Sequence, residues 1–432
     1  MKILHVLLLP VLCLFSACRS YNVFEAQMSI EQSFERRDYM QTISLIDGYK
    51  KAKTYRDRDD VLRLLEKGTA QRFAGNWTES TQTYHDAEQK IEMLYGSSVS
   101  RNISAFLIND YRLEYEGEDY EDVYLNAFKS LNYIQMEEPE NALVEARKMA
   151  FKLDKFVLRH EEVMREMARK DTTGRRIPLE AGQANIQNSA FAHFLSAVLF
   201  ATSGRPDNAR IEYNRMTGAF LDQGIAYNPE SPSSLEHIQR NTYNTLLIAF
   251  SGRSPLKTSA HVRLYLDDLD FHLKFAFPVL ERFSSRVGRV QVVINDTLTV
   301  PIPMIENMSK VSESVYKVKE PVIYARTFTR SFLRAVSTQK ARQVATTEGG
   351  DLAGSLVGLA GLIGTEALEM ADLRRWTTLP GQAYGNVVDL PEGEHRVRYQ
   401  YYSPTGSMVY ESEQTLMVGP DNLALTESIY YN

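Results

Sequence analysis

Small residues recur at one fixed spacing in the first half of the chain, and this spacing constrains the fold more than any other feature. In each of three stretches the recurring positions are separated by seven, five, four and three residues. The stretches are Gly68, Gly75, Ser80, Tyr84 and Ala87; Ser130, Glu137, Ala142, Ala146 and Met149; and Ala197, Gly204, Ala209, Tyr213 and Met216. From about residue 29 to residue 220, apolar residues also follow the period of amphipathic helices. The region therefore predicts repeated pairs of helices.

The spacing resembles that of tetratricopeptide repeats, which are helix-turn-helix units of about 34 residues. In such a unit, small residues let the two helices approach, a turn residue separates them, and a large residue fills the gap to the next unit. We expect repeat packing to be carried by Gly68, Gly75, Ala142, Ala146, Ala197, Gly204, Ala209 and Tyr213. A poorer copy begins at Arg37-Asp38-Tyr39 and includes Ile43. The equivalent positions 43, 80, 142 and 209 are 37, 62 and 67 residues apart, which predicts intervening helices or long insertions.

After residue 220 the pattern changes, and the chain as a whole is predicted to be α+β. A last helix over 234–251 is expected to cap the array. Alternation predicts strands at 262–266 and 289–296, a helix follows over about 320–344, and four short strands are expected within 382–431. The predicted divisions are a signal peptide (1–17), an all-α tetratricopeptide-like helical repeat domain (18–251), a mixed α+β region (252–380) and a small C-terminal module (381–432). Residues 390–399 are similar to small β-sandwich modules of surface-associated bacterial proteins.

The first eighteen residues predict export and lipidation. An apolar run after Lys2 leads to Ser16-Ala17-Cys18, which is typical of a secretory signal peptide and too short to span a bilayer. The ending resembles the lipobox of bacterial lipoproteins, although Phe15 stands where leucine is usual. The resemblance implies that Cys18 carries the lipid, palmitate included, and Arg19 in place of aspartate favours an outer-membrane lipoprotein facing the periplasm. The alternative is an ordinary cleaved signal. Residues 19–432 contain no cysteine, which excludes an internal disulfide.

Longer motifs resemble those of an uncharacterised family of bacterial tetratricopeptide-repeat envelope lipoproteins. They occur in the family's order at 124–133, 140–148, 209–213, 252–257 and 371–380, so they span most of the mature chain. Met216 departs from the family, which usually has alanine at that place. The resemblance implies an envelope lipoprotein with a helical repeat array, and it implies no particular chemistry.

No arrangement of residues predicts catalysis, a metal site or a cofactor. The eight histidines form no H-E-x-x-H pair, and the chain has neither a Gly-x-Ser-x-Gly elbow nor a phosphate-binding Gly-x-x-x-x-Gly-Lys loop. The only cysteine of the mature chain is assigned to the lipid. A formal charge of −6 argues against general nucleic-acid binding. We therefore expect a protein without enzyme activity, metal or cofactor.

Three other features are candidates for partner binding. Arg326, Arg330 and Arg334 recur every four residues and predict either a solvated helix face or a contact for an anion or an acidic partner. The glycine-rich segment 349–364 contains Gly-x-x-x-Gly and predicts either a buried, closely packed helix or a segment that touches membrane or partner. The third candidate is the groove of the repeat array, which in solenoid proteins receives a ligand.

Taken together, these features predict a lipid-anchored scaffold or adaptor of the bacterial cell envelope that binds a protein partner through its repeat groove. Two alternatives stay open. One is an activator of a peptidoglycan synthase, and the other is an accessory subunit of an outer-membrane secretion or pore assembly. The expected partners are an envelope protein and, through the lipid on Cys18, the membrane, and homo- or hetero-oligomers are both compatible with the sequence.

Overall fold

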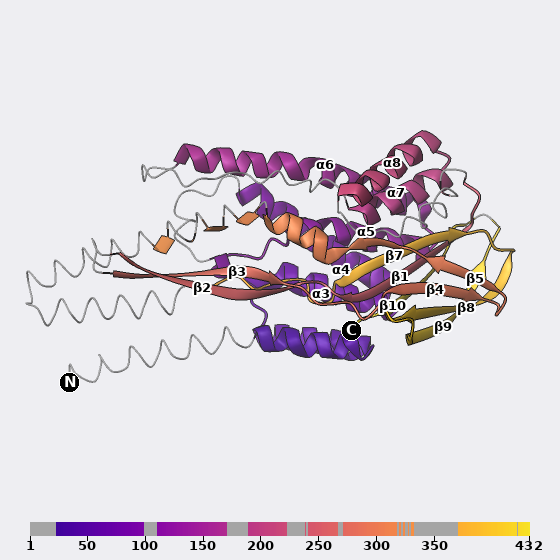
Figure 1. Ribbon diagram of the computed structural model, residues 1–432, viewed down its shortest axis with the longest axis horizontal. Helices are drawn as coiled ribbons and strands as arrows, with labels where there is room; N and C mark the ends of the chain where they lie inside the picture. Colours follow the sequence, from indigo (N-terminus) through magenta and orange to yellow (C-terminus); the bar gives the residue numbers. More distant parts are fainter. Residues whose placement is uncertain are drawn as a thin grey trace, which may run out of the picture.

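The first half of the chain folds into a row of antiparallel helical hairpins (Figure 1). The described residues contain four of them: helix 23–35 with α2 (Tyr39–Lys51), α3 (Asp60–Phe73) with α4 (Trp77–Ser98), α5 (Asp119–Gln135) with α6 (Pro139–Lys170), and α7 (Ala190–Thr202) with α8 (Pro206–Asp222). Short 3₁₀ turns at Asp57–Asp59 and Asp110–Arg112 lie before α3 and α5. Each hairpin packs on the next, since α2 contacts α3, α4 contacts α5 and α6 contacts α7.

The computed structural model describes residues 23–98, 110–170, 189–222, 238, 241–266, 271–317, 319–320, 323–324, 327, 330–331, 370–420 and 422–432. The predicted signal peptide (1–17), Cys18, Arg326, Arg334 and the glycine-rich segment 349–364 lie outside these residues. Within them, no helix combines the length and the apolar character needed to cross a bilayer.

The same backbone turn joins the two helices of each described hairpin. Two residues after the first helix ends, φ is positive: 62° at Arg37, 80° at Gly75, 58° at Glu137 and 69° at Gly204. The amide of the next residue donates a hydrogen bond to a carbonyl five residues earlier, with N···O distances of 2.8–3.2 Å. This arrangement satisfies carbonyl groups that the helix end would leave without a partner. The predicted turn residues Gly75 and Gly204 therefore occupy equivalent places.

The first hairpin has a different register from the one that the sequence predicted. Counted from its turn residue Arg37, the place of Ala142 and Ala209 is taken by Thr42, which is fully buried. The assignment of Ile43 to this place is therefore wrong by one residue, because the left-handed residue is Arg37 and not Asp38.

Two four-stranded sheets follow the hairpins. The first has the order β10–β1–β7–β6 and consists of β1 (Thr245–Arg253), β6 (Met304–Asn307), β7 (Pro380–Val388) and β10 (Ala424–Tyr430). The second has the order β5–β4–β8–β9 and consists of β4 (Arg289–Ile294), β5 (Leu298–Ile302), β8 (Gly393–Tyr402) and β9 (Met408–Val418). β1 runs parallel to β10 and antiparallel to β7.

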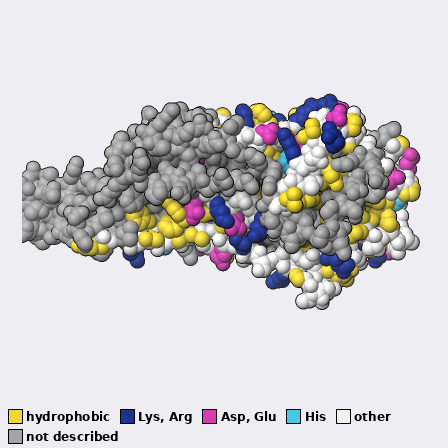
Figure 2. Space-filling view, turned by 45° about the horizontal axis from the view of Figure 1, so that its top comes forward, with side chains coloured by type: hydrophobic (Ala, Val, Ile, Leu, Met, Phe, Trp, Pro, Cys, Tyr) yellow, Lys and Arg dark blue, Asp and Glu magenta, His cyan; other side chains and the backbone are white. Residues whose placement is uncertain are grey.

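A two-stranded ribbon, β2 (Leu256–Leu266) and β3 (Phe271–Glu281), pairs with neither four-stranded sheet. It projects from the body formed by the hairpins and sheets (Figure 1). Figure 2 shows hydrophobic side chains exposed along it. Residues 308–317 are helical, and the described residues among 319–331 are helical as well.

The strands predicted at 262–266 and 289–296 correspond to the end of β2 and to β4, and the four strands predicted within 382–431 are also present. They do not form a module of their own. β7 and β10 flank β1, and β8 pairs with β4, so the predicted boundaries at 251 and 380 cut through both sheets. The helix predicted over 234–251 is wrong from residue 241 onward, because residues 241–244 are not helical and β1 begins at Thr245. Periodicity does not distinguish a short buried apolar strand from a buried helix.

β1 lies in the middle of three layers. Leu246, Ile248 and Phe250 belong to the core shared with the helices, whereas Leu247 and Ala249 belong to a second core between the two sheets. β10 contacts α5 and β6 contacts α7. In the first sheet, a Cβ atom on Gly385 would lie only 2.6 Å from the ring of Phe194 in α7, so this close approach requires glycine. The helices and the first sheet therefore pack as one body.

Candidate functional site

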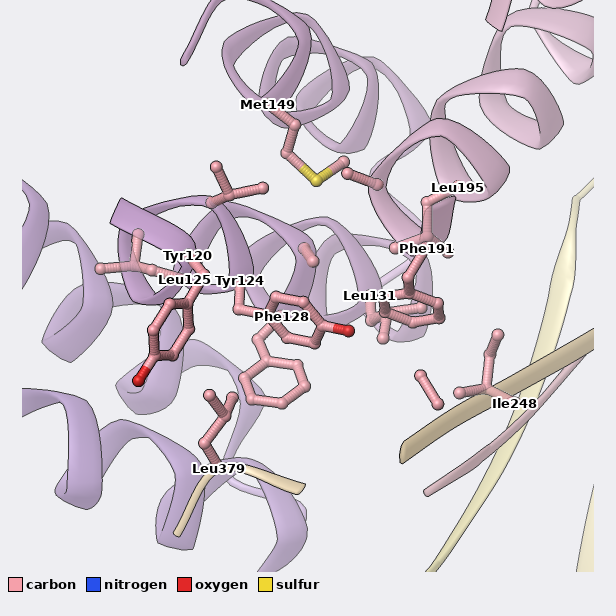
Figure 3. Close-up of a cluster of buried hydrophobic side chains, with 14 of the residues drawn as sticks. Tyr120, Tyr124, Leu125, Phe128, Leu131, Met149, Phe191, Leu195, Ile248 and Leu379 are labelled. Atoms are coloured by element: carbon pink, nitrogen blue, oxygen red, sulfur yellow. The ribbon is translucent and has the colours of Figure 1, made fainter. Parts of the chain in front are cut away.

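The chain itself covers the inner face of the helical array, where the sequence predicts a groove for a partner. Helices α3, α5 and α7 form this face and are buried along most of their length. Figure 3 shows Phe128 and Phe191 gathered with Ile248 of β1 and with Leu379. The rings of Phe128 and Phe191 each lie 5.7 Å, centroid to centroid, from the ring of Phe250 in β1. The first sheet therefore fills much of the predicted groove.

An irregular stretch of the chain, residues 371–379, occupies another part of the inner face and leads into β7. We call it the inner segment. Its tryptophan, Trp376, is 0% exposed. The indole lies 5.6 Å from the ring of Phe128 in α5 and 5.9 Å from the ring of Tyr84 in α4. The array thus encloses this side chain between two hairpins.

Trp376 is also held by hydrogen bonds. Its indole Nε1–H donates to the hydroxyl of Thr69 over 2.8 Å and to the hydroxyl of Thr378 over 3.0 Å. Its backbone N–H donates to Oε1 of Glu121 over 2.8 Å. Burial raises the pKa of Glu121, whose other oxygen accepts a hydrogen bond from Tyr115 over 2.7 Å. Both N–H groups of Trp376 are therefore satisfied, as burial requires.

Glu66 of α3 is the main acceptor beside Trp376. It is fully buried and accepts hydrogen bonds from Gln27 over 3.1 Å, from Thr377 over 2.7 Å and from Tyr55. Burial raises the pKa of Glu66 to about 7, against the opposing effect of these donors. Gln27 also donates to the carbonyl of Arg375 over 3.0 Å. The network therefore ties the first hairpin and α3 to the inner segment.

The two arginines of the inner segment are buried in ion pairs. Arg374 lies 3.1 Å from Asp59 and 2.7 Å from Asp372, and Arg375 lies 3.2 Å from Glu31. Burial alone would lower the pKa of Arg374, but Asp372 and Asp59 outweigh it and raise the pKa. Removing one partner of a buried pair costs about 3–5 kcal/mol. These guanidinium groups therefore fix the position of the inner segment.

A second group of buried charges lies between α4, α5 and α6. Lys129 lies 2.8 Å and Lys152 lies 2.9 Å from Glu88, and Lys152 lies 2.6 Å from Asp122. Burial would raise the pKa of Glu88, but the two lysines outweigh it and hold the pKa well below its usual range. Asp122 and Lys152 also line a small pocket together with Val311. Because they are paired with each other, we assign them to the contact between hairpins.

One carboxyl group fastens the first sheet to the start of α7. Glu306 of β6 is fully buried, and its Oε2 accepts hydrogen bonds from the hydroxyl of Ser189 and the amide of Phe191, each over 2.7 Å. Amides at a helix start have no partner within the helix, so a carboxyl group there satisfies them. Burial raises the pKa of Glu306 to about 7.

The predicted repeat-packing residues lie at the contacts within hairpins. A Cβ atom on Gly68 would lie 2.7 Å from the ring of Tyr84, so glycine permits this contact. The hydroxyl of Ser80 donates to the carbonyl of Gly68 over 2.8 Å, and that of Ser130 donates to the carbonyl of Ala142 over 3.2 Å. Burial is complete or nearly so at Ala142, Ala146, Ala197 and Ala209, and partial at Tyr213.

The predicted basic stripe is wrong at its central residue. Arg330 is only 1% exposed, and its Nη2 donates to the hydroxyl of Thr327 over 3.5 Å. A buried guanidinium group presents no charge to a partner. Arg326 and Arg334 lie outside the described residues.

Sequence reasoning missed the inner segment as an occupant of the groove, although residues 371–380 carry a family-like motif. The signal that was available is its composition: one tryptophan between two arginines and two threonines, with the period of neither helix nor strand. Such a stretch forms no helix or strand of its own, so its buried N–H and C=O groups need hydrogen-bond partners in other parts of the chain.

Comparison with family models, with curated proteins and with solved structures finds no match for this chain. In the part of the chain that the structure describes, no three His, Cys, Asp or Glu side chains gather in a way that would hold a metal ion. The functional argument therefore depends on the geometry of the array.

Proposed function

We propose that this protein is a lipid-anchored scaffold of the bacterial cell envelope that binds a protein partner on the outer helices of its array. The observation that carries the proposal is the occupied inner face, where Trp376 and β1 take the place predicted for a partner. The outer helices present large apolar side chains to solvent: Phe151 of α6 is 57% exposed and Leu221 of α8 is 79% exposed. Exposed apolar side chains of this size are typical of interaction surfaces when they gather.

The proposal includes the tetratricopeptide type for the hairpins. Its support is the same left-handed turn in four hairpins and the small buried residues that follow each turn five residues later. It also includes a β-sandwich for the two four-stranded sheets, which enclose a core of their own.

The anchor is tested by replacing the predicted lipid-bearing cysteine. Cys18→Ser should leave the protein without acyl chains and move it from the membrane fraction to the soluble fraction. Cys13→Ser is the matched control, because position 13 lies within the predicted signal peptide and should be removed with it. A Cys18→Ser protein that stays with membranes after a high-salt wash would contradict lipid anchoring.

The partner surface is tested by a photo-crosslinking amino acid introduced in cells. Placed at Phe151 or Leu221, it should form a covalent adduct with one envelope protein, and placed at the exposed Met408 of β9 it should not. Adducts from Met408 alone would place the partner on the second sheet and overturn the assignment to the array. If the adduct is a peptidoglycan synthase, glycan polymerisation with and without this protein tests an activating role.

A second candidate function is that of an accessory subunit of an outer-membrane secretion or pore assembly. The observation that favours it is the β2–β3 ribbon, which projects from the body and pairs with neither sheet (Figure 1).

A further inference from the structure

The β2–β3 ribbon has two chemically different faces. Opposed residues of an antiparallel pair lie on the same face, and successive residues alternate between faces. One face carries the pairs Thr258–Val279, Ala260–Phe277 and Val262–Phe275. The pairing shows no irregularity over its whole length, and the alternation of residue types continues toward the tip, where Leu264 is opposed to Leu273. One face of the ribbon is therefore predominantly apolar.

The other face carries polar residues of β2, which are opposed to Leu280, Pro278 and Ala276 of β3. Lys257, Ser259, His261 and Arg263 alternate with the apolar residues of β2. Lys257 pairs with Glu118, and its ammonium group also donates to the carbonyl of Arg374 over 3.0 Å. The base of the ribbon is thus fixed to the helical array through its polar face.

The apolar face is only partly covered. Near the base, the ring of Phe277 packs edge-on against Tyr324 at 4.9 Å. Val262 remains 41% exposed and Val279 remains 38% exposed. A two-stranded hairpin on its own has marginal stability in water, and exposed apolar surface lowers its solubility. The ribbon therefore presents an apolar surface that fits a partner.

The position of Val23, the first described residue, indicates what covers the apolar face. Val23 is five residues from Cys18, so a fully extended connection spans at most about 17 Å. In Figure 1 the described chain begins at the end of helix 23–35 that faces the side toward which the ribbon extends. Each strand of eleven residues is about 36 Å long, and the ribbon reaches beyond the start of that helix in the same view. An anchor on Cys18 would thus hold a membrane on the side where the ribbon projects.

We propose that the apolar face of the β2–β3 ribbon docks into the lipid bilayer that carries the acyl anchor. This proposal rests on the proposed lipid anchoring only to place the membrane on one side of the molecule. The apolar surface that docks is supplied by the ribbon itself. Its polar face stays toward water, as in other amphipathic elements that lie at a membrane interface.

Vesicle flotation tests the proposal separately from the anchor. The full mature chain with Cys18→Ser is mixed with vesicles of phosphatidylethanolamine and phosphatidylglycerol, and floated protein is measured. The unlipidated chain should float, and Val262→Asp should lower its partition about tenfold or more, since a carboxylate resists transfer from water. His261→Asp is the matched control one residue away on the polar face, and it should float as the parent does.

Labelling at the same two positions keeps the proposal testable even if Val262→Asp fails to fold. Because residues 19–432 contain no cysteine, Val262→Cys and His261→Cys in the Cys18→Ser chain each offer one thiol for an environment-sensitive dye. Vesicles should shift the emission of the dye at 262 to the blue and leave that at 261 unchanged.

Three results would overturn the proposal: no flotation of the parent chain, equal loss in Val262→Asp and His261→Asp, or equal dye shifts at both positions. If light scattering shows that the parent chain is oligomeric without lipid and that Val262→Asp is monomeric, a second copy covers the face and the proposal is also wrong. A membrane-bound wild-type protein with a non-floating Cys18→Ser chain would leave lipid anchoring intact and refute ribbon docking alone.

Discussion

Removal of the tryptophan side chain from the inner face should destabilise the whole body. Trp376 is fully buried between Tyr84 and Phe128. Truncation of a buried tryptophan to alanine costs about 3–5 kcal/mol through lost contacts and the cavity left behind. Trp376→Ala should therefore lower the free energy of unfolding by this amount.

A smaller change separates the ring from its hydrogen bond. Trp376→Phe keeps an aromatic ring but loses the indole N–H that donates to Thr69 and Thr378. The hydroxyl of Thr69 still donates to the carbonyl of Leu65 over 2.9 Å and lies 2.9 Å from the hydroxyl of Tyr84, so it is not left without a partner. The loss from the hydrogen bond alone should therefore be about 1 kcal/mol.

Urea denaturation followed by circular dichroism measures both variants. Because the inner segment contacts the helices and leads directly into β7, Trp376→Ala should shift the unfolding of helices and sheets together. Trp77→Phe is the control, since Trp77 lies half-buried at the start of α4. A Trp376→Ala protein that loses less than about 1 kcal/mol would refute the packing described for the inner face.

Three further substitutions test other parts of the structure by the same denaturation assay. Gly68→Ala should destabilise by about 1–3 kcal/mol because its Cβ would meet Tyr84, whereas Gly48→Ala, with nothing within 4 Å, should stabilise by about 0.5–1 kcal/mol; equal effects would contradict the close contact. Glu137→Gly should stabilise by up to about 1 kcal/mol, because Glu137 has a φ of 58° that suits glycine; destabilisation would contradict the turn. Burial raises the pKa of Glu306 from 4.5 to about 7, so its stabilising contribution is complete below pH 4.5 and is lost as pH rises through about 7, a change of about 3 kcal/mol. Glu306→Gln should remove this part of the pH dependence, and an unchanged profile between pH 4.5 and 8 would show that the carboxyl group is not buried as described.

The helical hairpins can be predicted from the sequence because their geometry is local. Two helices joined by a short turn meet at positions separated by a fixed number of residues, and those positions must be small. Gly68 and Ala142 show this rule, since each lies at such a contact and is buried. The exception is the first hairpin, where Thr42 takes the place predicted for Ile43. The left-handed residue of its turn is Arg37, and an arginine does not mark a turn in the sequence as a glycine does.

The sheets and the inner face depend on contacts between distant parts of the chain, which periodicity does not encode. Thr245 of β1 is opposed to Ala424 of β10 and to Val388 of β7, each more than a hundred residues away. The occupant of the groove is equally distant, because Trp376 meets Thr69 across 307 positions. Sequence spacing therefore predicts that the array has an inner face, but it does not predict that the same chain fills it.

The most direct test of the occupied inner face uses the fluorescence of Trp376 itself. The chain has two tryptophans, so Trp77→Phe leaves Trp376 as the only indole. In the native protein its emission should be blue-shifted and resist quenching by acrylamide, and both properties should be lost together when urea unfolds the chain. An indole that is quenched in the native protein as readily as in the unfolded chain would contradict the account, because Trp376 would then lie in solvent and the inner face would be open to a partner.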